Sequence, residues 1–110
     1  MSIDRNALAE LTEGILSAIG DSVSAIMLYG SSARGTATNE SDVDIAVMVR
    51  KALSKEEENR LDDLIVDLNL KYDKVFSVVD IADDEYQKWK NIVPFYKNVS
   101  SEGIILWKTA

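Results

Sequence analysis

The hydrophobic residues of this chain change their spacing along its length, and these changes predict helices that alternate with strands. Between residues 4 and 19 the apolar side chains recur every three or four positions, which predicts an amphipathic helix that ends near Gly20. Two continuous apolar runs follow, at Ser24–Tyr29 and Val43–Val49. Such uninterrupted runs predict strands that are buried on both faces or nearly so.

The second half of the chain opens with a helix signal. Ser54 and Glu57 have the spacing of a capping box, and apolar residues keep helical spacing to about Leu70. The acidic cluster Glu56–Glu58 falls in the first turn, where the helix dipole favours negative charge, so we interpret it as a helix start and not as a metal site. Further along, the pattern predicts a strand at residues 75–81, short helices at 83–90 and 95–101, and a final strand at 104–107.

These elements predict an α/β (α+β) fold, a short mixed β-sheet of about four strands with helices packed on one face. The chain has 110 residues and is 46% hydrophobic, which is enough for one core. It contains no internal repeat and no linker-like segment. We therefore expect a single domain over residues 1–110.

Composition narrows the range of functions. The formal net charge is −7, from 19 acidic and 12 basic residues, and this balance argues against direct binding to nucleic acid. There is no cysteine and no histidine, which excludes disulfides, cysteine chemistry, Ser-His catalysis and histidine zinc sites. The start of the chain does not resemble a signal peptide, and no apolar run is long enough for a membrane span, so we expect a cytoplasmic protein.

The segment between the first two predicted strands carries groups suited to phosphate. Gly30 permits backbone geometries that other residues resist and lets a ligand approach closely. Ser31 and Ser32 offer hydroxyl and amide donors for phosphate oxygens, and Arg34 adds a charged fork. We predict that these four residues bind the phosphates of a nucleotide, although Arg34 could also be an ordinary surface arginine or brace the loop.

Two carboxylates stand at the start of the second predicted strand. Asp42 and Asp44 are two positions apart, so a strand would project both side chains to the same face, roughly 6 to 7 Å apart. Mg²⁺ takes one or two carboxylates and completes its octahedron with water and substrate phosphates. A pair of ions about 3.5 to 4 Å apart can stabilise both the attacking and the leaving oxygen of an in-line displacement. We therefore predict that Asp42 and Asp44 are metal ligands and catalytic residues.

The spacing of these groups resembles a known signature. Gly30-Ser31, ten intervening residues and Asp42-Val43-Asp44 resemble the motif of the DNA polymerase beta-like nucleotidyltransferase superfamily. The stretch GSSARGTATNESDVDIAV from Gly30 to Val47 is most similar to the minimal nucleotidyltransferases (MNT proteins), small chains often paired with a HEPN-domain partner. The resemblance implies a nucleotidyltransferase fold, two Mg²⁺ ions and ATP as the substrate.

The family usually supplies a third carboxylate from a neighbouring strand, and two residues compete for that position. Asp80 is the only acid inside the third predicted strand, which makes it a candidate catalytic residue. Alignment on the acidic residues that follow places Ser77 at the expected position instead. The two are three residues apart, so they point to opposite faces and only one can face the metals.

The tail from Val93 to Leu106 also resembles a recurring tail of bacterial nucleotidyltransferase domains. Core packing by Phe95, Val99 and Trp107 explains it adequately. Alternatively, Tyr96 and Lys97 lie near the nucleotide as stacking and charge partners.

Three functions remain open at this point. The resemblance favours an Mg²⁺-dependent nucleotidyltransferase that moves AMP from ATP to a hydroxyl of a partner protein, as the antitoxin of a HEPN toxin. The uncertain third carboxylate leaves a second reading, a binding module that neutralises its partner by contact without turnover. Transfer to a small molecule, as in aminoglycoside-modifying relatives, is a third; because the chain is too short for a second substrate domain, it would need a homo-oligomer to build the acceptor pocket.

Overall fold

The structure is a computed structural model that describes residues 5–30, 33 and 42–109. The elements agree closely with the predicted ranges and follow one another along the chain as α1 (Arg5–Ile19), the 3-10 helix η1 (Gly20–Ser22), β1 (Val23–Tyr29), β2 (Val43–Val49), α3 (Lys55–Tyr72), β3 (Phe76–Ala82), α4 (Asp83–Trp89), α5 (Pro94–Glu102) and β4 (Ile104–Lys108). No helix within these described ranges is both long and apolar enough to cross a membrane.

The described strands form one mixed sheet in the order β3-β2-β1-β4. β1 pairs antiparallel with β2 on one side and with β4 on the other, whereas β2 and β3 are parallel. A parallel pair needs a crossover connection, and α3 supplies it. The α/β class and the predicted four-stranded mixed sheet are thereby confirmed.

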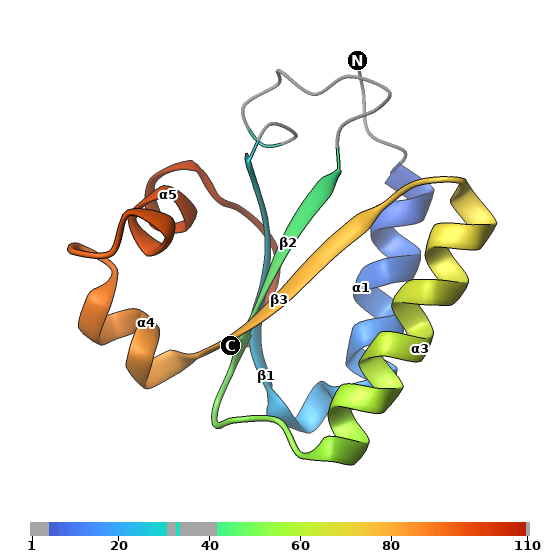
Figure 1. Ribbon diagram of the computed structural model, residues 1–110, viewed down its shortest axis with the longest axis horizontal. Coiled ribbons are helices and arrows are strands. Elements are labelled where there is room, and N and C mark those ends of the chain that lie inside the picture. Colours follow the sequence, from blue (N-terminus) through green and yellow to red (C-terminus); the bar gives the residue numbers. More distant parts are fainter. Residues whose placement is uncertain (1–4, 31–32, 34–41, 110) are drawn as a thin grey trace.

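Helices cover both faces of the sheet, which corrects the expected one-sided packing. The long helices α1 and α3 lie side by side on one face, and the short helices α4 and α5 lie on the other (Figure 1). The sequence pattern did not reveal this division because α4 and α5 bury little: Val99 is their one fully buried residue within the described part of the chain.

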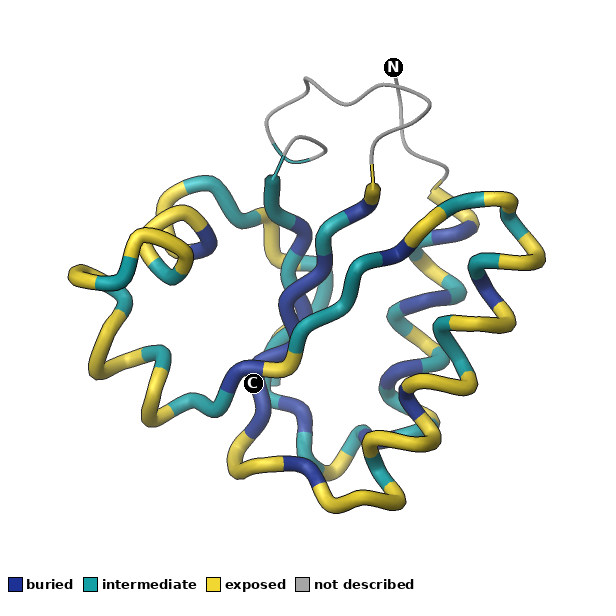
Figure 2. Tube along the Cα trace, viewed as in Figure 1, coloured by how far each residue is buried: buried dark blue, intermediate teal, exposed yellow. Residues whose placement is uncertain are grey.

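Each face of the sheet has its own apolar core (Figure 2). The larger core lies under α1 and α3 and includes Leu11, Ile15, Ile45, Val47 and Leu68, all fully buried or nearly so. The smaller core lies under α4 and α5, around Ala46, Met48, Ile81 and Val99. Alternate residues of β2 thus enter different cores. Because both faces of the strand are buried, its sequence is a nearly continuous run of apolar residues.

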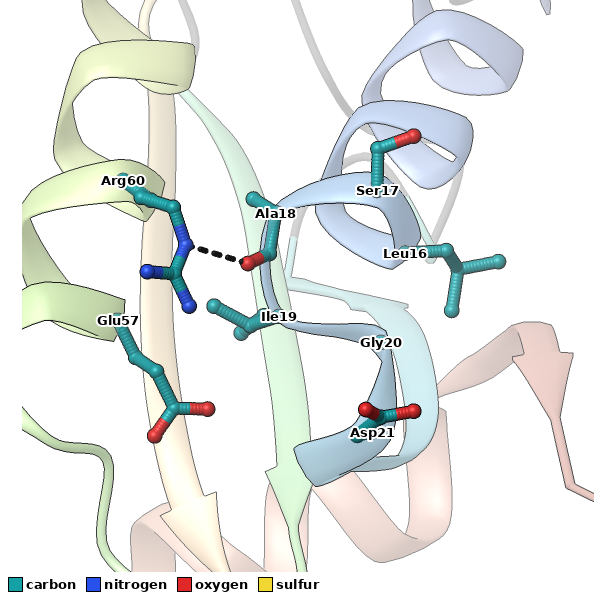
Figure 3. A pocket seen from close by; sticks show the side chains of 8 residues that line it. All are labelled: Leu16, Ser17, Ala18, Ile19, Gly20, Asp21, Glu57 and Arg60. Carbon is teal, nitrogen blue, oxygen red and sulfur yellow. Dashed lines mark hydrogen bonds between the residues drawn. The ribbon is translucent and has the colours of Figure 1, made fainter.

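Polar contacts fix α3 against α1 and η1. The Nε of Arg60 donates a hydrogen bond to the carbonyl oxygen of Ala18 over 2.8 Å (Figure 3). Glu57 completes the predicted capping box with Ser54, and its carboxylate also accepts a hydrogen bond from the Ser22 hydroxyl. The Ser22 hydrogen bond, and then the backbone of Ser54, lower the pKa of Glu57.

A second group of polar contacts joins α1 and α3 nearer to their other ends. Lys71 Nζ lies 2.7 Å from Glu10 Oε1, and the Tyr72 hydroxyl donates to the same oxygen over 2.9 Å. The Lys71 contact, followed by that of Tyr72, lowers the pKa of Glu10. Because α1 and α3 are held at both ends, the sheet beneath them has a rigid backing.

Candidate active site

Gly30, the one predicted phosphate-binding residue that the structure describes, and the predicted carboxylates lie at one end of the central strand pair. β1 ends at Tyr29 and β2 begins at Val43, and the antiparallel register places Tyr29 directly opposite Asp44. Side chains of directly opposed residues lie on the same face of a sheet. Asp44 therefore shares the face of Tyr29, which is the face covered by α4 and α5.

Gly30 follows Tyr29 and lies against the Asp44 side chain. Its φ angle is 73°, in the left-handed region that favours glycine. A Cβ atom built at Gly30 would contact Asp44 Oδ2 and lie 3.3 Å from Asp44 Cγ. Both the backbone conformation and the close approach of the Asp44 side chain thus favour glycine at this position, and the bend at Gly30 packs against the carboxylate on β2.

Of the other predicted site residues, the structure describes Asp42 but not Ser31, Ser32 or Arg34. Asp42 is exposed and stands one residue before β2, at the same end of the sheet as Asp44. Ser31, Ser32 and Arg34 lie outside the described residues, so their phosphate-binding role stays a prediction.

The parallel register between β2 and β3 separates Ser77 from Asp80. Asp44 pairs with Ser77, whereas Asp80 pairs with Val47, whose side chain enters the core under α1 and α3. Asp80 is exposed on β3. The structure therefore brings Ser77 to the face of Asp44 and does not bring Asp80 there, and this geometry counts against a catalytic role for Asp80.

A row of aromatic rings runs from Asp44 across the same face. Tyr29 and Phe95 make an edge-to-face contact with ring centroids 5.6 Å apart. Phe95 in turn contacts Tyr96 at 5.6 Å, and Tyr96 contacts Tyr86 of α4 at 6.1 Å. Burial of the phenol, and to a smaller degree the charge of Asp44, raise the pKa of Tyr29 above its ordinary value of 10.0.

Sequence reasoning missed part of this row. Phe95 was assigned to core packing, but it is exposed, while Tyr96 is the ring that packs against the core under α4 and α5. The core roles expected of Val99 and Trp107 are confirmed, on opposite faces of the sheet. The signal for Tyr29 was its position directly before Gly30, which makes it the last residue of β1 beside the turn.

The donor set fits a hard divalent cation. Carboxylate oxygens from Asp44 and Asp42 are the ligand type that Mg²⁺ prefers, and such an ion takes its remaining ligands from water and phosphate oxygens. Among the residues described here, no three acidic side chains gather closely enough to form a metal cage by themselves. An Mg²⁺ ion at this end of the sheet would therefore be shared between protein and nucleotide.

A separate hollow of about 430 Å³ lies between the end of α1 and the start of α3 (Figure 3). It adjoins the residues that precede β1, so it is at the opposite end of that strand from Gly30. Two of its polar side chains, Arg60 and Glu57, are engaged with Ala18, Ser22 and Ser54. These contacts make the hollow part of the helix packing and not of the nucleotide site.

Comparison with known proteins gives the family of this chain. The family model described as "Polymerase beta, Nucleotidyltransferase" matches residues 14–109 of this chain. A protein of Methanocaldococcus jannaschii, named a protein adenylyltransferase, is 30% identical over 104 residues, which is 94% of this chain and 98% of that protein. The chain belongs to the Polymerase beta nucleotidyltransferase family, as its Gly-Ser and Asp-x-Asp spacing predicted.

Solved structures with the same fold include toxin–antitoxin complexes. A crystal structure of a toxin–antitoxin with AMP-PNP has a TM-score of 0.63 at 23% identity and covers 93% of this chain and 73% of that one. A complex of a tri-AMPylated Shewanella oneidensis HEPN toxin with an MNT antitoxin has a TM-score of 0.52 at 20% identity, covering 94% and 73%. At these identities the likeness establishes the fold.

Proposed function

We propose that this chain transfers AMP from ATP, in the presence of Mg²⁺, to a hydroxyl group of a partner protein. The observation that supports the proposal is the packing of Gly30 against the Asp44 side chain, which brings the start of the predicted phosphate-binding segment beside a predicted metal ligand. The relative named a protein adenylyltransferase supports a protein as the acceptor. Triphosphate at Gly30, Ser31, Ser32 and Arg34 would then present its α-phosphorus near Asp44.

The proposed partner is a HEPN toxin, with this chain as its antitoxin. The support is the fold shared with chains of toxin–antitoxin complexes, one of which contains a tri-AMPylated HEPN toxin with an MNT antitoxin. The acidic surface of this chain, with its formal charge of −7, suits a protein partner better than nucleic acid.

The proposed reaction is an in-line transfer of AMP from the nucleotide to the acceptor hydroxyl. The acceptor oxygen forms a bond to the α-phosphorus, the bond from that phosphorus to the bridging oxygen breaks, and pyrophosphate leaves. Asp42 and Asp44 would hold Mg²⁺, which when bound offsets the charge of the phosphates. Ser77, directly across from Asp44, is not a carboxylate, so the acceptor's hydroxyl proton would pass to water or to a base other than residue 77.

Intact-mass spectrometry of a co-expressed HEPN partner tests the transfer. Incubation with ATP and Mg²⁺ should add the mass of one or more AMP groups to the partner, and Asp44→Asn should abolish the addition. Asp80→Asn is the matched control, because Asp80 is exposed on the other side of the sheet from Asp44 and should leave the addition unchanged. Absence of any added mass with the wild-type chain would contradict the proposal.

A second candidate function is favoured by Ser77. Without a carboxylate on β3 beside Asp44, the chain could neutralise its partner by contact alone. In that case Asp42→Asn and Asp44→Asn would neutralise the toxin fully while no mass is added. Loss of neutralisation in step with loss of the added mass would exclude this candidate.

A further inference from the structure

We propose that Phe95 is the platform on which the base of the nucleoside triphosphate stacks. The inference rests on the proposed function, since it assigns the base-binding part of the same nucleotide site. It is carried by the contact of Phe95 with Tyr29, the residue directly opposite Asp44.

The position of Phe95 follows from two steps across the sheet. Adjacent strands lie about 4.8 Å apart, so Tyr29 is the immediate neighbour of Asp44 on the α5 side of the sheet. The Phe95 ring centroid is 5.6 Å from that of Tyr29. A nucleotide with its phosphates at Asp44 therefore reaches Phe95 by extending its base past the Tyr29 ring.

Phe95 differs from the other rings of the row in being both exposed and fixed. Its relative exposure is 38%, whereas Tyr96 and Tyr29 are half-buried against the core under α4 and α5. Contacts with Tyr29 and Tyr96 hold the Phe95 ring from two sides. An aromatic ring that is immobilised but open to solvent can stack a base at low cost in side-chain entropy.

The charges around Phe95 also suit a nucleotide. The first turn of α5 contains no acidic residue, and the exposed Lys97 lies two positions after Phe95. The first turn of α4, by contrast, carries Asp83, Asp84 and Glu85, which would repel a polyanion. Of the two helices on this face, α5 is thus the one that can accept a triphosphate nucleotide.

The chemistry of stacking determines the class of substrate. Stacking uses the π-face that every base has, so it does not depend on a particular pattern of hydrogen bonds. The Phe95 ring would therefore recognise the base of a nucleoside triphosphate and not its phosphates. A nucleoside triphosphate should accordingly bind more tightly than a polyphosphate that lacks a base.

Isothermal titration calorimetry with two probes separates the base site from the phosphate site. ATP and inorganic tripolyphosphate are each titrated, with Mg²⁺, into the wild-type chain, Phe95→Leu and Phe95→Trp. Leucine keeps an apolar side chain but removes the ring, and tryptophan restores one. Trp89→Leu is the control, because Trp89 has a similar exposure of 36% but lies on α4.

Phe95→Leu should weaken ATP binding about 5- to 100-fold, the range expected for one lost base–aromatic stack, while tripolyphosphate binding stays unchanged. Phe95→Trp should retain ATP affinity, and Trp89→Leu should behave as wild type. Unchanged ATP affinity in Phe95→Leu, or an equal loss of affinity for ATP and for tripolyphosphate, would contradict the stacking role of Phe95. Failure of the wild-type chain to bind either probe would instead contradict the proposed function.

Discussion

Gly30 and Asp44 are packed so closely that no side chain fits between them. A Cβ at Gly30 would contact Asp44 Oδ2, and the φ angle of 73° independently favours glycine. The two residues come from consecutive strands and are brought together by the β1–β2 register. This contact places the bend at the end of β1 beside the carboxylate of β2, at the proposed nucleotide site.

Gly30→Ala should reduce AMP transfer at least tenfold, because the new methyl group displaces the Asp44 carboxylate from the bend. Its left-handed backbone should also cost roughly 1–2 kcal/mol of unfolding free energy. Gly20→Ala is the matched control: a Cβ there would meet only Leu16 Cβ, at 3.9 Å. Urea unfolding and a transfer assay on both variants check this prediction, and full activity of Gly30→Ala would contradict it.

Ser77→Asp should increase the rate of AMP transfer about tenfold or more. The register places residue 77 directly across from Asp44, so an aspartate there would add a carboxylate able to bind metal or to accept the hydroxyl proton. Single-turnover rates with the HEPN partner measure the effect.

The same assay applied to Asp80→Asn tests the other candidate for the third acid. Because Asp80 pairs with Val47 and is exposed, its loss should leave the rate within twofold of wild type, roughly the scatter expected when no catalytic group is removed. A large loss of rate in Asp80→Asn together with no gain in Ser77→Asp would contradict the conclusion that Ser77, and not Asp80, lies on the face of Asp44.

Glu57 should make folding stability depend on pH in the acidic range. Its pKa is lowered from the ordinary 4.5 by the Ser22 hydroxyl and by the Ser54 backbone. A lowered folded-state pKa means that the stabilisation is present above pH 4.5 and is lost as the pH falls through the folded value. Wild type should therefore be more stable than Glu57→Gln at neutral pH, and the difference should shrink below pH 4.5.

Denaturant unfolding at several pH values measures that difference. Glu58→Gln removes a charge from the same turn of α3 but not the cap to Ser54, so it should show a smaller difference from wild type at neutral pH. A pH-independent gap between wild type and Glu57→Gln would show that the carboxylate cap is not its source.

The elements could be predicted from the sequence because each is encoded locally. The three- and four-residue spacing before Gly20 and the Ser54–Glu57 box gave two helices, and the apolar runs gave the strands. The side of the sheet taken by α4 and α5 could not be read in this way. That side depends on Val99 and Tyr96 meeting Ala46 and Met48, residues far away in the sequence.

The candidate site, too, could be predicted only where its residues are close in the sequence. The spacing of Gly30 and Asp44 was visible in the sequence, but the choice between Ser77 and Asp80 needed the β2–β3 register, which a shift of one residue would invert. The exposed ring of Phe95 was missed because an aromatic residue before Tyr96 and Val99 fits the pattern of a buried helix face.

The most direct test of the account is calorimetry of ATP binding, with Mg²⁺, to the wild-type chain and to Asp44→Asn. Asp44 is the described residue that joins the bend to the proposed metal, so the wild-type chain should bind ATP and Asp44→Asn should lose at least tenfold in affinity. Equal affinities of the two proteins for ATP, or no binding to the wild-type chain, would contradict the nucleotide site described here.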